Sequence, residues 1–139
     1  MVIMAIDLGH VRTGVAISDK TELLASPVGT ITERRDDRLA EKLAELAKER
    51  GAEHLVLGLP RNMDGSLGES AQRAEAFADT LQTLTGLPVT LWDERLTTVS
   101  AIGYLNQTDT RGKKRKQVVD TVSAVIILED FLRHKKNQS

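Results

Sequence analysis

The segment that most constrains the fold is His54–Leu59, a short run without polar alternation. Such a run, ended by Pro60, is typical of a strand that other elements cover on both faces. Helical patterns flank it along the chain. One is predicted over Asp36–Arg50, and a second runs to about Leu84 after a turn-rich stretch at 61–68. The segment therefore indicates a strand inside a sheet that carries helices.

Four further strands are predicted from short apolar or alternating runs bounded by turn residues: Val2–Ile6, Thr13–Ser18, Leu23–Thr32 and Leu87–Trp92. The first three follow one another closely enough to form antiparallel hairpins. Helices are predicted over Leu96–Leu105 and Gln117–His134, and the basic segment 106–116 between them shows no periodicity and is interpreted as a loop. This order predicts one α/β domain over residues 1–139, a mixed five-stranded sheet (three antiparallel strands, then two more) flanked by helices.

The composition is that of an ordinary globular protein, with 40% hydrophobic and 28% charged residues. A formal net charge of −1 argues against binding nucleic acid by overall charge alone, although a local basic patch is compatible with it. The absence of cysteine excludes disulfides and thiolate metal sites and fits a reducing compartment. The first apolar run is too short for a signal peptide, and no run is long enough to cross a bilayer. We therefore expect a cytoplasmic protein with no membrane association.

Acidic residues stand at the ends of, or inside, otherwise apolar segments. Asp7 closes the first predicted strand, Asp93 and Glu94 close the last one, and Asp120 interrupts an aliphatic stretch. An ionised carboxylate is rarely buried without a partner, and oxygen ligands of this kind favour Mg²⁺ or Mn²⁺. Because ligands collect at the carboxyl ends of strands in open sheets, Asp7 and the Asp93-Glu94 pair are expected at one rim. These carboxylates together predict a metal site.

Each acid also has a structural alternative. Asp7, followed by Leu-Gly, can cap a hairpin turn, and the same pattern opens the nucleotide-binding domains of actin-like and sugar-kinase-like ATPases. Those proteins need two such domains, for which this chain is too short. Asp93 and Glu94 can stabilise the N-terminus of a helix by capping it or by interacting with its dipole. Because side chains alternate along a strand, only one of the two is expected to face Asp7, and Glu94 is favoured. Asp120 by itself can be a helix cap.

Five positive charges in six residues, from Arg111 to Lys116, precede the last of these acids. The structural interpretation of such a run is a solvated, mobile loop, and such a loop can still grip phosphates beside an acidic site. Aromatic residues make up only 3% of the chain, so we expect recognition of backbone and shape rather than base stacking. Gly9 would let the backbone approach a phosphate. The candidate substrate-binding residues are Gly9, Arg12, Arg61, Asn62, Arg95, Thr97, Lys113, Lys114, Arg115 and Lys116.

Four motifs occur in order along nearly the whole chain: Ala5–Gly9 with Arg12–Asp19, Val56–Ser66, Asp93–Thr98, and Val119-Asp120 with the aliphatic segment that ends at Leu128. Together they resemble the YqgF (RuvX) family of Holliday-junction-resolvase-like and pre-16S rRNA nucleases. The resemblance implies an RNase H-like fold, and the acidic triad predicted for the family maps onto Asp7, Glu94 and Asp120. Thr13 and Ser123 stand where the family more often has an aliphatic residue and Ala, and neither belongs to the triad.

The resemblance implies a Mg²⁺- or Mn²⁺-dependent nuclease that hydrolyses phosphodiester bonds, with Asp7 bridging two ions and Glu94 and Asp120 completing their coordination. It also implies a structured RNA substrate such as pre-16S rRNA, in ribosome biogenesis, and leaves branched DNA open. The alternative from another class is a non-catalytic nucleic-acid-binding ribosome-assembly factor. A monomer and a homodimer are both compatible with the sequence, and symmetric cutting of a four-way junction would require the dimer.

Overall fold

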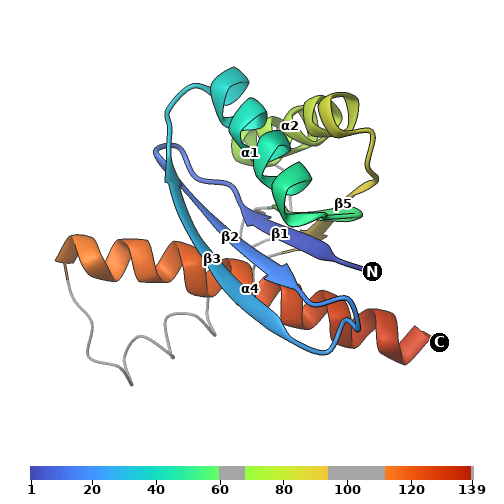
Figure 1. The fold of residues 1–139 in the computed structure, drawn as a ribbon. Coiled ribbons are helices and arrows are strands. Elements are labelled where there is room, and N and C mark those ends of the chain that lie inside the picture. Colours follow the sequence, from blue (N-terminus) through green and yellow to red (C-terminus); the bar gives the residue numbers. More distant parts are fainter. Residues whose placement is uncertain (60–67, 94–111, 139) are drawn as a thin grey trace.

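The computed structural model describes residues 1–59, 68–93 and 112–138 (Figure 1). Within them the elements are, in chain order, β1 (Ile3–Asp7), β2 (Arg12–Ser18), β3 (Ala25–Thr32), α1 (Asp36–Arg50), β4 (His54–Leu59), α2 (Glu69–Thr85), β5 (Val89–Asp93) and α4 (Gly112–Gln138). The predictions for α1 and β4 are confirmed at both ends. The other strands and α2 are confirmed with ends shifted by one or two residues.

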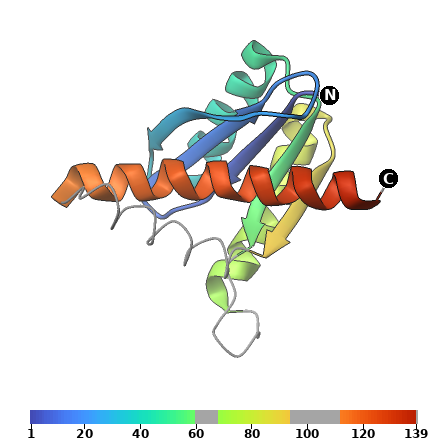
Figure 2. The same ribbon diagram turned by 90° about the horizontal axis from the view of Figure 1, so that it is seen from below.

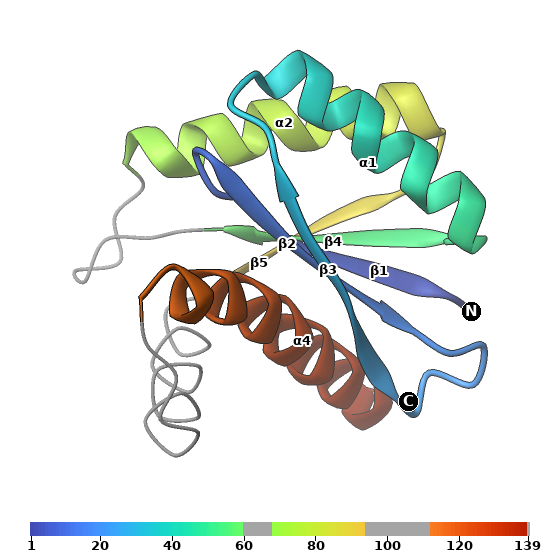
Figure 3. The same ribbon diagram turned by 60° about the vertical axis from the view of Figure 1, so that its left-hand side comes forward.

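The five strands form one sheet in the order β3-β2-β1-β4-β5. β1, β2 and β3 pair antiparallel to one another, whereas β4 pairs parallel with both β1 and β5. Helices α1 and α2 lie over one face of this sheet, and α4 lies over the other (Figure 3). Seen from the side of α4, this helix runs across the strands (Figure 2). The predicted α/β class and the mixed five-stranded sheet are confirmed.

Strand alternation divides the interior into two cores. Met4 and Ile6 of β1 point to the core under α1 and α2, and Ile3 and Ala5 point to the core under α4. In β4, Leu55 and Leu57 belong to the first core and Val56 to the second, all with 0% exposure. Because both faces of β4 are covered, its sequence lacks polar alternation, as the central-strand interpretation requires.

The ends of α1 follow from local chemistry. Asp36 and Asp37 occupy its first turn, and Lys48 and Arg50 its last, so the charges complement the helix dipole at both ends. Gly51 ends the helix in the left-handed conformation, with φ of 69°, a geometry that favours glycine. These signals place Asp36 at the start of α1, and Arg73 contacts both this residue and Gly9 in the turn between β1 and β2.

The start of α4 corrects the sequence prediction. The sequence predicts a loop over 106–116 and a helix from Gln117, whereas α4 begins at Gly112. The prediction is wrong over 112–116 because Lys and Arg are good helix formers, and a polar, aperiodic run of them can belong to a helix. Asp120 therefore lies about two turns inside α4 and is no cap.

The helix predicted over Leu96–Leu105 lies outside the described residues. Although α4 has 27 residues, neither it nor any other helix in the described ranges is apolar over a long enough stretch to cross a membrane.

Aromatic side chains tie the carboxyl-terminal part of α4 to β4 and β5. Phe131 contacts His54 and Trp92 edge-on, with ring centroids 5.5 and 5.7 Å apart. Nε2 of His54 lies 2.7 Å from Oγ1 of Thr90. Burial, and secondly the positive charge of Lys135, lower the pKa of His54. The folded protein therefore favours the neutral imidazole at this position.

We expect acid to destabilise the protein through His54. Because the folded-state pKa is lowered, the unfolded chain takes up this proton first as the pH falls below about 6.5, the ordinary value for histidine. The free energy of unfolding should therefore decrease between about pH 7.5 and pH 5.5. The decrease should be smaller in His54→Gln, which has no imidazole to protonate. Urea unfolding of both proteins over this range measures the difference, and parallel curves would contradict the assignment.

Candidate active site at the carboxyl edge of the sheet

Parallel pairing brings the carboxyl ends of β1, β4 and β5 to one edge of the sheet. The register aligns Ile6 with Leu57 and Leu57 with Leu91. Asp7 and Asp93, the last residues of β1 and β5, therefore end at the same edge with β4 between them. With neighbouring strands about 4.8 Å apart, their backbones are roughly 10 Å from one another. The backbones of these two residues thus meet the expectation of a common rim.

Alternation places Asp7 on the face of the sheet that α4 covers. Ala5 belongs to the core under α4, and Ile6 belongs to the core under α1 and α2. Since successive side chains of a strand point to opposite faces, Asp7 shares the face of Ala5. Asp7 is half-buried, as is usual for a carboxylate at the end of a strand whose other residues are in the core.

The other predicted acidic and basic residues fall in two groups. One group lies outside the described residues: Arg61, Asn62, Glu94, Arg95 and Thr97. The other group lies near the start of α4, where the helical backbone is described: Lys113, Lys114, Arg115, Lys116 and Asp120. Among the described side chains, no three His, Asp or Glu residues gather closely enough to hold a metal ion. A metal site built from Asp7, Glu94 and Asp120 therefore stays a prediction.

The turn between β1 and β2 is tight at Gly9. A Cβ atom at this position would lie 1.9 Å from the carbonyl oxygen of Arg12, so a side chain does not fit this backbone. The Gly9 N–H donates to Oγ1 of the buried Thr13 at 3.3 Å. The turn itself therefore requires glycine, whether or not a phosphate approaches it. Arg12 is half-buried at the start of β2. Thr13 contributes the hydroxyl that supports the turn.

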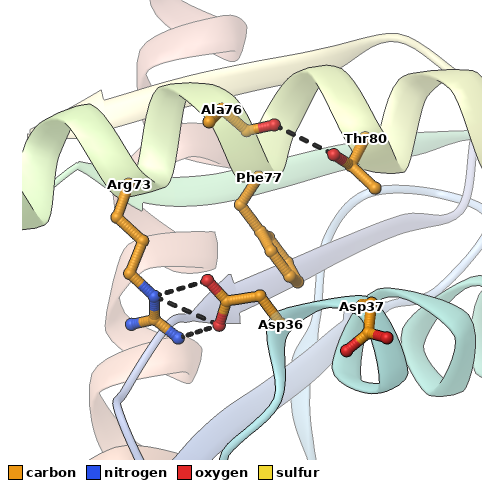
Figure 4. A pocket seen from close by; sticks show the side chains of 6 residues that line it. All are labelled: Asp36, Asp37, Arg73, Ala76, Phe77 and Thr80. Atoms are coloured by element: carbon orange, nitrogen blue, oxygen red, sulfur yellow. Dashed lines mark hydrogen bonds and ion pairs between the residues drawn. The ribbon is translucent and has the colours of Figure 1, made fainter.

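Arg73 of α2 binds the same turn from another side. Its Nη2 donates to the carbonyl oxygen of Gly9 at 3.1 Å. Its Nε donates to Oδ2 of Asp36 at 2.9 Å, and the two side chains form an ion pair (Figure 4). The hydrogen bond from Arg73 outweighs the cost of burial and holds the pKa of Asp36 below its usual range. Asp36 is consequently ionised at neutral pH, and its charge keeps the guanidinium beside the turn.

Sequence reasoning missed Thr13, Asp36 and Arg73 as residues of this region. Arg73 lies 37 residues from Asp36 and 64 from Gly9 along the chain, so no local pattern could indicate their contact. The acidic start of α1 explains Asp36 without any reference to the turn. Thr13 offered a weak signal, since a hydroxyl stands there in a run of otherwise apolar strand residues.

A groove of about 250 Å³ lies between α1 and α2. Its described lining residues come from these two helices: Asp36, Asp37, Arg73, Ala76, Phe77 and Thr80 (Figure 4). The charged groups of Arg73 and Asp36 satisfy each other there, and Asp7 is not among these lining residues. The groove therefore lies apart from Asp7. The hydrogen bond from Arg73 to Gly9 is the described contact that joins the groove to the turn after Asp7.

Comparison with known proteins gives matches over nearly the whole chain. A family model described as “RuvX: Holliday junction resolvase” matches residues 1–134. A relative from Desulfitobacterium hafniense (strain DSM 10664 / DCB-2), named “Putative pre-16S rRNA nuclease”, is 45% identical over 142 residues, which cover 100% of this chain and 99% of the relative.

Two solved structures share the fold. RuvC of T. thermophilus in complex with a Holliday junction substrate has a TM-score of 0.63 at 14% identity, covering 98% of this chain and 96% of that one. The resolvase of Fowlpox virus in complex with Holliday junction DNA has a TM-score of 0.62 at 10% identity, covering 97% and 99%. At these identities the likeness concerns the fold alone, and the expected RNase H-like fold is confirmed.

We expect Gly9→Ala to be more damaging than a glycine substitution elsewhere. The new Cβ would force the turn away from the Arg12 carbonyl, at a cost of roughly 3 kcal/mol in the free energy of unfolding. Gly51→Ala is the matched control, because Gly51 has a left-handed backbone with open space around it and should cost only about 1 kcal/mol. Urea unfolding measures both values. Equal losses in the two variants would show that the close approach at Gly9 is absent.

Proposed function

This chain belongs to the RuvX family, and from that membership we propose that it is a nuclease that hydrolyses phosphodiester bonds in precursor 16S rRNA. The observation that carries the proposal is the position of Asp7. It is a half-buried carboxylate at the edge where the carboxyl ends of three parallel strands meet, on the face that α4 covers. The name of a relative that matches over its whole length supports the RNA substrate. A cytoplasmic location follows from that substrate.

We assign Glu94, in preference to Asp93, as the second carboxylate of the site. Leu91 packs in the core under α1 and α2, and Trp92 packs in the core under α4. A strand that continues this alternation brings position 94 to the face of Trp92 and Asp7, and position 93 to the opposite face. The described part of β5 therefore supports Glu94 as the partner of Asp7.

The third carboxylate is assigned to Asp120 of α4. Asp120 precedes Ala124 by four residues and Ile127 by seven, and both of these side chains pack in the core between α4 and the sheet. Residues at these spacings share one face of a helix. The spacing therefore supports an Asp120 on the sheet-facing side of α4, which is also the side of the sheet to which Asp7 belongs.

Three carboxylates provide an all-oxygen donor set, which fits Mg²⁺ or Mn²⁺. Asp7, Glu94 and Asp120 would hold the ion, which would supply Lewis-acid chemistry for the scissile phosphate and for a water nucleophile. Two of the proposed donors belong to regular elements: Asp7 stands at the end of a strand that pairs on both sides, and Asp120 lies inside a long helix. Donors carried by regular elements are placed more reproducibly than donors on loops.

The helical start of α4 divides its basic residues into two sets. Lys116 and Lys113 precede Asp120 by four and seven residues, so they share its helix face, whereas Lys114 and Arg115 are out of phase with it. We therefore assign phosphate contacts on α4 to Lys113 and Lys116 first. The remaining proposed substrate contacts are Gly9, Arg12, Arg61, Asn62, Arg95 and Thr97.

A four-way DNA junction is the second candidate substrate, because the matching family model is described as a Holliday junction resolvase. Symmetric cutting of such a junction would require two active sites and therefore a homodimer. A ribosome-assembly factor that binds RNA without cutting it is the third candidate. It predicts that replacing Asp7 leaves both binding and cellular function intact.

Cleavage should depend on both metal and Asp7. We expect labelled pre-16S rRNA fragments to be cut with Mn²⁺ or Mg²⁺ and to stay intact in EDTA. Asp7→Asn should lower the rate by roughly 100-fold or more, because a neutral amide is a poor metal ligand, and should leave RNA binding nearly unchanged. Asp37→Asn, which replaces an exposed carboxylate of α1, is the matched control and should cut at the wild-type rate.

The outcomes separate the three candidates. Cutting of four-way junctions but not of RNA would favour the second substrate. If the folded protein binds RNA but cuts neither substrate with any metal, the nuclease proposal fails in favour of the assembly factor.

The two sets of basic residues on α4 should differ in RNA affinity. Lys113→Gln with Lys116→Gln should reduce the slope of log affinity against log salt concentration by about 1.5, the loss expected for two phosphate contacts. Lys114→Gln with Arg115→Gln removes the same charge from the out-of-phase positions and should reduce the slope by less than half as much. Fluorescence anisotropy with a labelled RNA over a range of salt concentrations measures both slopes. Equal slopes would contradict the assignment of faces.

A further inference from the structure

We propose that Arg73 and Asp36 are positioning residues of the acidic site: they fix the turn between β1 and β2 and thereby the orientation of the Asp7 carboxylate. This inference rests on the proposed function, because it concerns how the same site is kept in its working geometry. Neither residue belongs to the predicted triad or to the predicted phosphate contacts.

The first step of the argument is the geometry of the guanidinium. Nε of Arg73 donates to Oδ2 of Asp36 at 2.9 Å and to Oδ1 at 3.2 Å, and Nη2 donates to Oδ1 as well. The same Nη2 donates to the carbonyl oxygen of Gly9 at 3.1 Å. Figure 4 shows the side chain of Arg73 extending from α2 toward Asp36 at the start of α1. One rigid, planar group therefore joins two helices to the turn.

The second step concerns the turn. The ladder between β1 and β2 ends at the pair of Asp7 with Gly14, so the residues just after Asp7 depend on other bonds. Gly9 is held on two sides, through its N–H to Thr13 and through its carbonyl oxygen to Arg73. The bond to Thr13 is long, at 3.3 Å, which leaves the bond from Arg73 as the shorter of the two. Removing Arg73 therefore takes away the shorter of the two bonds to Gly9, two residues beyond the carboxylate.

The third step separates this pair from an ordinary ion pair. The side chains of Arg73 and Asp36 are 20% and 45% exposed, whereas those of Arg35 and Asp37, an ion pair in the same region of α1, are 60% and 62% exposed. Exposed ion pairs contribute little to stability. Arg35 donates to Asp37 and makes no described contact with the turn. The chain thus contains two Arg–Asp pairs of similar chemistry, of which one reaches the turn.

Small displacements of a catalytic group have large kinetic effects, since a shift of about 1 Å can cost roughly 100-fold in rate. Residues that orient metal ligands from outside the coordination shell typically contribute a factor of about 10 to 100 in metal affinity or activity. We therefore expect Arg73→Met to lower kcat and to raise the Mn²⁺ concentration needed for half-maximal cleavage, each by about tenfold or more. KM for the RNA should change by less than about twofold, because the guanidinium of Arg73 is engaged by Asp36 and Gly9.

The experiment compares five variants of the full chain. Arg73→Met removes both contacts of the guanidinium, Arg73→Lys keeps a positive donor and should recover part of the loss, and Asp36→Asn keeps the acceptor without its charge. Arg35→Met and Asp37→Asn are the controls for the exposed pair and should behave as the wild type. Each variant is measured for kcat, KM, Mn²⁺ dependence, thermal midpoint and, by calorimetric titration, Mn²⁺ affinity.

Three results would overturn the inference: an Arg73→Met variant with the kinetics of Arg35→Met, a loss expressed in KM alone, or no recovery in Arg73→Lys. Calorimetry keeps the inference testable apart from the proposed function. If the wild type cuts no substrate but binds Mn²⁺, a weaker affinity in Arg73→Met alone supports the positioning role. If the wild type binds no Mn²⁺, there is no metal site to position and the inference fails together with the metal assignment.

Discussion

The parallel pairing of β4 with β1 on one side and β5 on the other brings the last residues of β1 and β5, Asp7 and Asp93, to one edge of the sheet. An antiparallel strand at either position would send its last residue to the opposite edge of the sheet. The pairing is secured by burial, since Leu55, Val56 and Leu57 are all fully covered. A slip of one residue would turn each of these side chains to the wrong core, so register and site geometry are maintained by the same apolar contacts.

The two faces of the sheet have different roles. The face under α1 and α2 contains the larger core, and the face under α4 receives Asp7. The contact of Arg73 with Gly9 links them, because it reaches from a helix of the first face to the turn that follows the acid of the second. The helix layer of α1 and α2 therefore also restrains the turn that follows Asp7, the acid proposed to take part in the chemistry.

Much of the fold could be predicted from the sequence, because its signals are local. The central strand at His54–Leu59 and the helix at Asp36–Arg50 are marked by uninterrupted apolar residues, charges at the helix ends and a terminal glycine. The predicted start of α4 was wrong because composition alone does not distinguish a polar helix from a polar loop. In the candidate site, the place of Asp7 at the carboxyl edge of the sheet could be predicted, because this acid closes an apolar run. The contact of Arg73 with Gly9 could not be predicted, because it joins residues that are far apart in sequence and depends on how α1 and α2 pack on the sheet.

The length of α4 has a consequence for the proposed site. This helix has 27 residues and measures about 40 Å, and its far end is anchored by Phe131 and by Lys135, whose Nζ lies 2.6 Å from Oε1 of Glu22. Because a helix advances by about 100° per residue, that anchorage sets the rotational phase of every position before it. One residue inserted between Asp120 and Ala124 would turn position 120 by about 100° relative to the buried Ala124 and Ile127, with the backbone still helical. The proposed role of Asp120 therefore depends on the number of residues that separate it from this anchored part of α4.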